Sequence, residues 1–169
     1  MRTILIIGAG RSASSLIQYL LNKSEKENLH LVIGDLSLAL AKKKTNNHPN
    51  ATAIALDIFD ENQRKEAIQK ANIVISMLPA HLHIEVAKDC IIYKKHLVTA
   101  SYVSDAMQEL DAAAKENNLI FMNEIGLDPG IDHMSAMKVI DEIKEKGGEM
   151  LLFESFCGGL VAPESDTNL

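Results

Sequence analysis

The sequence predicts an α/β fold built on a parallel sheet, because short apolar runs alternate with longer amphipathic stretches. The apolar runs are nearly continuous, as in strands that helices cover on both faces. The stretches between them carry apolar residues at helical spacing. Repetition of strand and helix in this way implies right-handed crossovers between parallel strands. Together these observations predict a doubly wound α/β domain.

Six apolar runs are expected to form the strands of this sheet. They are TILIIG (3–8), LHLVIGD (29–35), ATAIALD (51–57), NIVISML (72–78), HLVTAS (96–101) and LIFMNE (119–124). Helices are expected at 12–21, 60–70, 80–93 and 104–117, and a further helix at 130–146 repeats its apolar residues every three positions. We expect a further strand at EMLLFESF (149–156).

The composition excludes several classes of function. The net charge is −6 and no stretch is both strongly basic and aromatic, which argues against nucleic acid as a partner. No apolar run approaches the ~20 residues that span a membrane. Cys90 and Cys157 lack metal-ligand spacing and a secretory context, so we expect a reduced protein in the cytoplasm. His81 and His83 lack a matching ligand set, so we predict no metal site and exposed or helix-capping roles for both.

The first expected strand leads into a glycine-rich motif, IGAGRSA (7–13). Gly8 permits the tight turn, Gly10 lets the backbone approach a pyrophosphate, and Ala13 lets the helix pack closely on the strand. The helix amino end would then face the phosphates. At the first strand–helix turn of an α/β chain, the motif predicts a Rossmann-like dinucleotide site. The alternative is a glycine-rich turn without a ligand.

Asp35 ends the second expected strand and bears on the choice of dinucleotide. A carboxylate there can accept hydrogen bonds from ribose hydroxyls, and it would repel a 2′-phosphate. No arginine stands beside it in the sequence. Asp35 therefore favours NAD over NADP, while the alternative interpretation is that it caps the next helix.

Ligands of open α/β sheets bind outside the carboxyl ends of the strands. In this sequence those ends fall at Asp57, at Met77 and the two residues after it, at 100–102, and from Glu124 onward. Polar groups occur at most of these positions, so we expect them to line one crevice, with Met77 beside the cofactor. His133, in the first turn after Gly130, is interpreted as a structural residue, with a catalytic role as the alternative.

Three segments resemble saccharopine dehydrogenase of the glutamate-forming type, also called saccharopine reductase. They are VTASYVSDAMQELDAAAKENNL (98–119), MNEIGLDPGIDHMSAMKVIDE (122–142) and SFCGGLVAPESDTN (155–168), and the resemblance extends over essentially the whole chain. It implies an NAD(P)-binding Rossmann domain at 1–124. Residues 125–169 would begin a second α/β domain that is truncated here and whose remainder would hold much of the substrate.

The resemblance also implies an activity and a set of site residues. The family interconverts saccharopine with glutamate and 2-aminoadipate semialdehyde in lysine metabolism, using NAD or NADP. Matched by motif, the pyrophosphate would be held by Gly8, Gly10, Arg11, Ser12 and Ala13. Asp57 and Ile58 would flank the adenine. The nicotinamide end would be lined by Ala100, Ser101, Leu127, Asp128 and Pro129. Saccharopine would contact Ser101, Tyr102 and Asp128, and the polar groups nearest the reacting carbon would be Tyr102, Asp128 and Cys157.

Oxidation of a secondary amine needs an acid and a base close to the reacting carbon. Asp128 is the candidate base or, alternatively, the counter-charge of a substrate ammonium, and Tyr102 could donate or relay a proton. Asp128 could also cap a helix that has Pro129 in its first turn.

Carboxylate recognition limits what this chain can do alone. Saccharopine has three carboxylates, which arginine usually clamps. The sequence contains only Arg2, Arg11 and Arg64, none expected at the substrate end of the crevice. We therefore expect this chain by itself to bind dinucleotide without turning over saccharopine.

The sequence leaves other functions open. Carboxynorspermidine dehydrogenase and lysine 6-dehydrogenase share the architecture, although GLDPGIDHM followed by FCGGL favours saccharopine. A dinucleotide-sensing module without chemistry is the alternative from another class, and the polar strand ends argue against it. The expected partner is a small amino-acid substrate, with a homodimer as a candidate assembly of the full-length protein.

Overall fold

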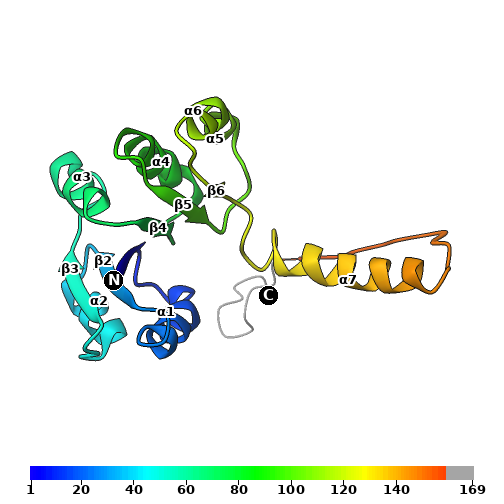
Figure 1. Cartoon of the computed structure of the whole chain (residues 1–169), viewed down its shortest axis with the longest axis horizontal. Helices are drawn as coiled ribbons and strands as arrows, with labels where there is room; N and C mark the ends of the chain where they lie inside the picture. The colour runs from blue at the N-terminus through cyan, green and yellow to red at the C-terminus, as the bar shows by residue number, and fades with distance from the viewer. Residues whose placement is uncertain (159–169) are drawn as a thin grey trace, which may run out of the picture.

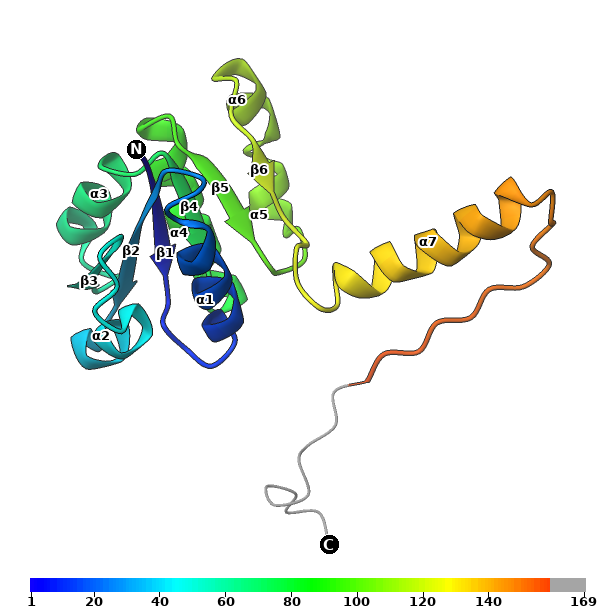
Figure 2. The same cartoon turned by 60° about the horizontal axis from the view of Figure 1, so that its bottom comes forward.

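The structure, a computed structural model, describes residues 1–158 and contains a six-stranded sheet that is parallel throughout. The strand order is β3–β2–β1–β4–β5–β6 (Figure 2). The chain therefore winds outward from β1 in one direction and then, from β4, in the other, which confirms the doubly wound fold. The strands are β1 (Arg2–Ile7), β2 (Leu29–Asp35), β3 (Ala51–Ala55), β4 (Ile73–Ser76), β5 (His96–Thr99) and β6 (Phe121–Met122).

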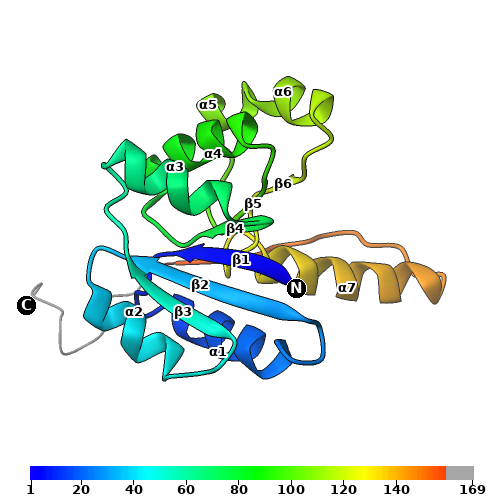
Figure 3. The same cartoon turned by 60° about the vertical axis from the view of Figure 1, so that its left-hand side comes forward.

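Helices cover both faces of this sheet (Figure 3). On one face lie α1 (Ala13–Lys23) and α2 (Leu38–Thr45). On the other face lie α3 (Glu61–Gln69), α4 (His83–Ile92), α5 (Asp105–Gln108) and α6 (Asp111–Glu116), and a single 3-10 turn, η1 (Ala80–Leu82), precedes α4. The prediction of one helix over 104–117 is wrong, because the chain bends between α5 and α6. The bend lets both Met107 and Leu110 pack against the core.

The central strand β1 supplies side chains to both hydrophobic cores. Leu5 and Ile7 join the core beneath α3 and α4, while Ile4 and Ile6 join the core beneath α1 and α2. All four side chains are buried, as the continuous apolar run of the first strand predicts. Burying each such side chain contributes roughly 1.5–3 kcal/mol. The two cores hold the carboxyl end of β1, where the glycine motif begins, in a fixed place.

The last helix, α7 (Ile131–Glu145), extends away from the sheet, and residues 149–156 run back beside it (Figure 1). The predicted strand at 149–156 is wrong for this structure, because within residues 1–158 this segment has no strand neighbour to pair with. The apolar face of α7 is exposed in the described residues, including Met134 and Met137. None of the helices within residues 1–158 has the length and apolar character that a membrane crossing requires. Residues 159–169, which end the third resembling segment, lie outside the described residues.

Candidate active site

The glycine motif forms the turn between β1 and α1. Gly8 has φ +106° and donates its N–H to the Gly34 carbonyl at 2.8 Å. A Cβ at Gly8 would lie 2.8 Å from the backbone oxygen of Met77, so only glycine fits this turn. Gly10 is exposed, and a Cβ there would meet no heavy atom of the described residues within 4 Å. The space beside Gly10 is therefore open to a ligand rather than filled by protein.

The residues after Gly10 continue this ligand-facing turn. Arg11 and Ser12 are exposed, and Ser12 precedes α1 without using its hydroxyl as a helix cap. Ala13 is fully buried where α1 meets the sheet. The amide groups at the start of α1 thus face the open side of the loop, where an anionic group is favoured. The pyrophosphate site itself stays a prediction at these positions.

Asp35 connects the glycine loop to the segment that follows β2. Its Oδ2 accepts the Ala9 N–H at 2.7 Å and its Oδ1 accepts the Ser37 N–H at 2.8 Å. The alternative interpretation of Asp35 as a helix cap is wrong, because Ser37 is the cap of α2 and accepts the Leu40 N–H through its Oγ. Each carboxylate oxygen has a second lone pair. Asp35 therefore fixes the loop and can still accept a hydrogen bond from a ligand hydroxyl.

A pocket of about 150 Å³ opens between the ends of β1, β2 and β3, beside Gly8. Asp57 and Ile58 line it, as expected for residues that flank an adenine. Leu36 and Phe59 also line it, and the sequence reasoning missed them, although Leu36 directly follows Asp35 and Phe59 lies two residues after Asp57. The pocket is lined by Ile7, Gly8, Gly34, Asp35, Leu36, Leu56, Asp57, Ile58, Phe59 and Leu78.

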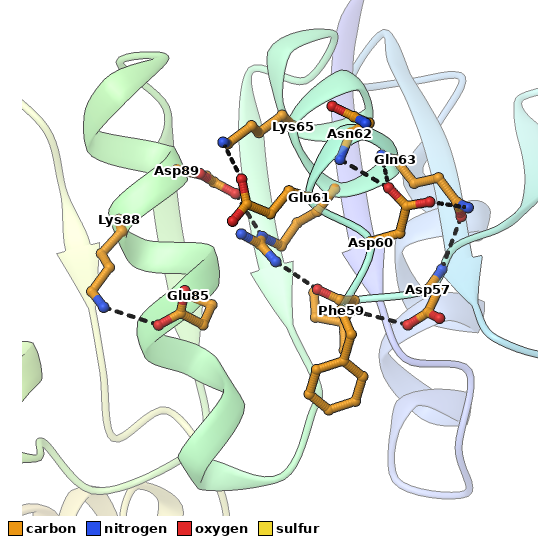
Figure 4. A network of polar contacts seen from close by, with 12 residues as sticks. Asp57, Phe59, Asp60, Glu61, Asn62, Gln63, Lys65, Glu85, Lys88 and Asp89 are labelled. Atoms are coloured by element: carbon orange, nitrogen blue, oxygen red, sulfur yellow. Dashed lines mark hydrogen bonds and ion pairs between the residues drawn. The ribbon is translucent and has the colours of Figure 1, made fainter.

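The wall of this pocket is held by a network of polar contacts around the start of α3 (Figure 4). The Phe59 N–H donates to Asp57 Oδ1 at 2.9 Å, and the Asp57 N–H donates to Gln63 Oε1 at 3.1 Å. Arg64, which is buried, donates from one terminal nitrogen to the Ile58 carbonyl at 2.6 Å. These bonds fix the backbone of the pocket wall.

The same arginine forms a buried ion pair. Its Nε lies 2.6 Å from Oδ2 of Asp89 on α4, and Asp89 is also buried. Figure 4 shows Asp89 facing α3 from α4. The sequence reasoning placed Arg64 on a helix away from the strand ends but gave no sign of its partner, because Asp89 lies 25 positions further on.

After β5, at the same edge of the sheet, two of the predicted residues, Tyr102 and Cys157, lie around the carboxylate of a third, Asp128. The Tyr102 hydroxyl donates to Asp128 Oδ1 at 2.5 Å. This hydrogen bond, with a smaller contribution from burial, raises the pKa of Tyr102 to about 12. A hydrogen bond from the Cys157 thiol to Asp128 likewise raises the pKa of Cys157. Cys157 is exposed, but the bond disfavours the reactive thiolate that an exposed cysteine would otherwise offer. Tyr102 therefore acts as a hydrogen-bond donor at neutral pH.

The loop after β6 brings Asp128 to this place by following the end of β5. The Ile125 N–H donates to the Thr99 carbonyl at 3.2 Å, and the Glu124 N–H donates to the Ser101 carbonyl at 3.1 Å. A Cβ at Gly126 would lie 2.8 Å from the Ala100 carbonyl oxygen. The loop thus packs closely on the ends of the strand, which positions Asp128 opposite Tyr102.

The loop then folds back on itself before α7 begins. The Gly126 N–H donates to the Pro129 carbonyl at 2.8 Å, and the Ile131 N–H donates to the Gly126 carbonyl at 2.9 Å. The Asp128–Pro129 peptide is cis. The predictions that Asp128 caps the helix and that Pro129 lies in its first turn are wrong. The helix starts at Ile131, whose N–H donates to the Gly126 carbonyl.

Asp132 supports the start of α7 in place of Asp128. Its Oδ1 accepts the Gly130 N–H at 2.9 Å and lies 2.8 Å from His133 Nδ1. The hydrogen bond and charge of Asp132 raise the pKa of His133. His133 is exposed and paired in this way, which agrees with a structural role.

The remaining nicotinamide-end residues follow the strand ends. Met77 donates its N–H to the Ile7 carbonyl at 2.8 Å and lies beneath Gly8. Ala100 lies beneath the Gly126 loop, while Leu127 projects into solvent and Pro129 is buried. The structure therefore arranges these predicted residues along the one edge of the sheet that also holds the glycine loop.

His83 is the residue for which the sequence prediction fails most clearly. His81 is exposed as expected, but His83 is buried, and Leu82 rather than His83 is the N-cap of α4. Its Nδ1 lies 2.8 Å from Ser76 Oγ and its Nε2 lies 2.9 Å from Ser101 Oγ. Burial, with a smaller contribution from the charge of His81, lowers the pKa of His83. Nothing in the sequence indicated this, because the bonds depend on how α4 packs against β4 and β5.

Comparison with known proteins agrees with this arrangement. Residues 4–122 match the family described as the saccharopine dehydrogenase NADP binding domain. The chain belongs to the saccharopine dehydrogenase family. Residues 126–169 match the saccharopine dehydrogenase C-terminal domain. The glycine loop and the adjoining pocket are thus parts of a domain of the NAD(P)-binding type.

Individual relatives include a saccharopine dehydrogenase and a protein with another name. The chain is 42% identical over 168 residues to saccharopine dehydrogenase [NADP(+), L-glutamate-forming] of Schizosaccharomyces pombe, covering 99% of this chain and 37% of that protein. It is 37% identical to alpha-aminoadipic semialdehyde synthase of Arabidopsis thaliana, covering 98% of this chain and 17% of that protein. This chain therefore spans only a minor part of the curated relatives that it matches.

Solved structures give the same result for the fold. The apo saccharopine dehydrogenase (L-Glu forming) of Saccharomyces cerevisiae matches with a TM-score of 0.77 at 33% identity, covering 87% of this chain and 32% of that one. KijD10, a 3-ketoreductase from Actinomadura kijaniata, matches with a TM-score of 0.65 at 18% identity, covering 85% of this chain and 44% of that one. The second likeness concerns the fold alone. The fold of this chain thus also occurs in a protein of low sequence identity.

Proposed function

We propose that this chain is the NAD-binding part of an oxidoreductase that acts on the secondary amine of saccharopine in lysine metabolism. The observation that carries the proposal is the position of Asp128, which accepts the Tyr102 hydroxyl at the sheet edge that also holds the glycine loop. Family membership supports the reaction class. We assign residues 1–124 to the dinucleotide-binding domain and residues 125–169 to the start of the substrate domain.

The proposed chemistry divides between cofactor and protein. A bound NAD would accept the hydride from the carbon beside the substrate nitrogen, and the protein would orient that carbon. Asp128 uses one oxygen for Tyr102, which leaves the other to hold a substrate ammonium as its counter-charge. Tyr102, whose pKa is raised to about 12, stays protonated at neutral pH. Its one O–H donates to Asp128, so its oxygen remains free only to accept a hydrogen bond from the substrate.

The positions of the three arginines support the proposal that this chain binds the dinucleotide while the rest of the protein binds the substrate carboxylates. Arg64 is buried in its ion pair with Asp89, and Arg2 donates to the Glu27 carbonyl at 3.1 Å. Arg11 lies on the glycine loop. These positions agree with the expectation that the carboxylates of saccharopine are clamped by arginines outside this chain.

The charge of the pocket beside Gly8, which we call the adenosine pocket, supports NAD over NADP. The residues lining the described pocket include Asp35 and Asp57 and no cationic side chain. A 2′-phosphate beside Asp35 would meet like charge, which near a protein surface costs on the order of 1–4 kcal/mol. Relatives whose names include NADP(+) are similar in sequence to this chain, so the proposed preference depends on this local charge.

Calorimetric titration of the chain with NADH and NADPH tests the cofactor preference. We expect NADH to bind at least about tenfold more tightly, the ratio that corresponds to 1.4 kcal/mol. Asp35→Asn should bring the two affinities closer together, because it removes the repulsive charge. Tighter binding of NADPH by the unsubstituted chain, or a ratio that Asp35→Asn leaves unchanged, would contradict the role of Asp35.

Steady-state kinetics of the full-length protein with saccharopine test the role of Asp128. We expect Asp128→Asn to lower kcat/KM by about a hundredfold, mostly through KM, because losing the partner of a desolvated charge costs about 2–5 kcal/mol. Asp132→Asn is the matched control and should change kcat/KM little. A loss confined to kcat would identify Asp128 as the base instead, and an unchanged kcat/KM would remove it from the site.

A further inference from the structure

A chain of three side chains connects the buried end of β4 to the crevice. Ser76 is fully buried at the end of β4, His83 is buried at the start of α4, and Ser101 is half-buried just after β5. The imidazole lies between the two hydroxyls, at 2.8 Å from Ser76 Oγ and 2.9 Å from Ser101 Oγ. Both ring nitrogens are therefore used, and the ring can turn only if both bonds break.

The imidazole between these hydroxyls is neutral for physical reasons. Burial, and then the charge of His81, lower the pKa of His83. His83 is also the first residue of α4, where the helix dipole disfavours a cation. A neutral imidazole has one donor and one acceptor nitrogen. The ring therefore fixes the position of the Ser101 oxygen and also whether Ser101 receives or donates the shared proton.

Ser101 lies next to the residues of the proposed active site, so the position of its hydroxyl affects the contacts made there. Its backbone carbonyl accepts the Glu124 N–H at 3.1 Å, which begins the loop that presents Asp128. The next residue is Tyr102, whose hydroxyl donates to Asp128. Ser101 thus adjoins both the strand-end edge and the Tyr102–Asp128 pair, and a shift of its hydroxyl would change the contacts made there.

We propose that His83 is a positioning residue that acts through Ser101, holding its hydroxyl toward the nicotinamide end of the dinucleotide. The inference rests on the proposed function of this crevice. His83 itself touches no ligand, since its two nitrogens are occupied by the serines. Its effect is confined to the nicotinamide end, because the adenosine pocket is lined by residues from β1, β2, β3 and the segments that follow them and from Leu78.

Two substitutions of His83 separate this role from a structural one. The amide nitrogen of glutamine can occupy the place of Nε2, so His83→Gln can still bond Ser101. The amide nitrogen of asparagine occupies the place of Nδ1, so His83→Asn can bond Ser76 but does not reach Ser101. Ser101→Ala removes the proposed contact itself. Thermal denaturation verifies that each variant is folded before ligand binding is measured.

The experiment measures the affinities of NADH and ADP-ribose for the chain by calorimetry, since ADP-ribose lacks the nicotinamide. We expect His83→Asn and Ser101→Ala each to weaken NADH binding by about fivefold, the worth of one hydrogen bond. Binding of ADP-ribose should stay within about twofold, His83→Gln should resemble the unsubstituted chain, and the His83→Asn/Ser101→Ala double variant should be no weaker than either single variant.

Several results would overturn the inference. They are an unchanged NADH affinity in His83→Asn, an equal loss of ADP-ribose binding, equal losses in the Asn and Gln variants, or additive losses in the double variant. An unsubstituted chain that binds neither NADH nor ADP-ribose would overturn the proposed dinucleotide site and this inference together. If the unsubstituted chain binds both NADH and ADP-ribose and His83→Asn binds NADH equally well, the inference about His83 is overturned while the dinucleotide site stands.

Discussion

Arg64→Met is expected to lower the free energy of unfolding by about 3–5 kcal/mol, because it leaves Asp89 buried without its partner. The Arg64 Nε lies 2.6 Å from Asp89 Oδ2, and side-chain exposure is only 6% for Arg64 and 4% for Asp89. The same change removes the donor to the Ile58 carbonyl. Urea denaturation followed by circular dichroism measures the loss.

Lys65→Met is the matched control for this substitution. Lys65 is the next residue along α3, and it forms an ion pair with Glu61 that is partly exposed to solvent (Figure 4). Such exposed pairs contribute roughly 0–1 kcal/mol. The double variant Arg64→Met/Asp89→Leu should recover much of the stability, since apolar side chains then replace both charges. A single variant Arg64→Met as stable as Lys65→Met would show that the buried pair is not what joins α3 to α4.

Gly10→Ala is expected to weaken NADH binding by at least about a hundredfold, because its methyl group would occupy the space beside the loop amides. Losing two charge-assisted hydrogen bonds of about 1.5 kcal/mol each has this effect. The fold should be unaffected, with a stability change within about 0.5 kcal/mol, because the added Cβ meets no described heavy atom within 4 Å. Calorimetry and urea denaturation measure the two quantities.

Gly8→Ala provides the contrast, because Gly8 has φ +106° and a Cβ there would lie 2.8 Å from the Met77 backbone oxygen. This variant should lose about 1–3 kcal/mol of stability as well as NADH binding. Normal NADH binding by Gly10→Ala would contradict the pyrophosphate position. A stable, tightly binding Gly8→Ala would contradict the geometry of the turn.

Local patterns in the sequence determined most of the sheet and the nucleotide loop. The run TILIIG predicted β1, because a strand covered on both faces needs apolar side chains on both sides, and Ile4 to Ile7 are indeed buried in two cores. Gly8 and Ala13 were predicted from spacing alone, and they occupy the tight turn and the buried helix contact. The strand ends already placed Tyr102 and the segment after Glu124 at one edge of the sheet, whereas only the resemblance to the saccharopine dehydrogenase family singled out Asp128 and Cys157.

Tertiary structure alone decided the contacts between elements that are distant in the chain. The strand predicted at 149–156 failed because a strand forms only where a neighbour supplies hydrogen bonds, and the run of apolar residues does not reveal that neighbour. Asp128 proved to bond Tyr102, 26 positions away, rather than to cap α7. The hydrogen bonds of Arg64 to Asp89 and of His83 to Ser101 likewise join residues that are distant in the sequence.

The physical reason is that local structure depends on residues close together in the sequence, whereas buried polar contacts depend on residues far apart in it. Turn geometry and helix or strand periodicity depend on residues within a few positions, so the sequence shows them directly. A buried histidine or arginine is tolerated only where folding supplies its hydrogen-bond partners. Those partners come from other strands and helices, so only the packed sheet shows that His83 is buried beneath the site instead of exposed at a helix end.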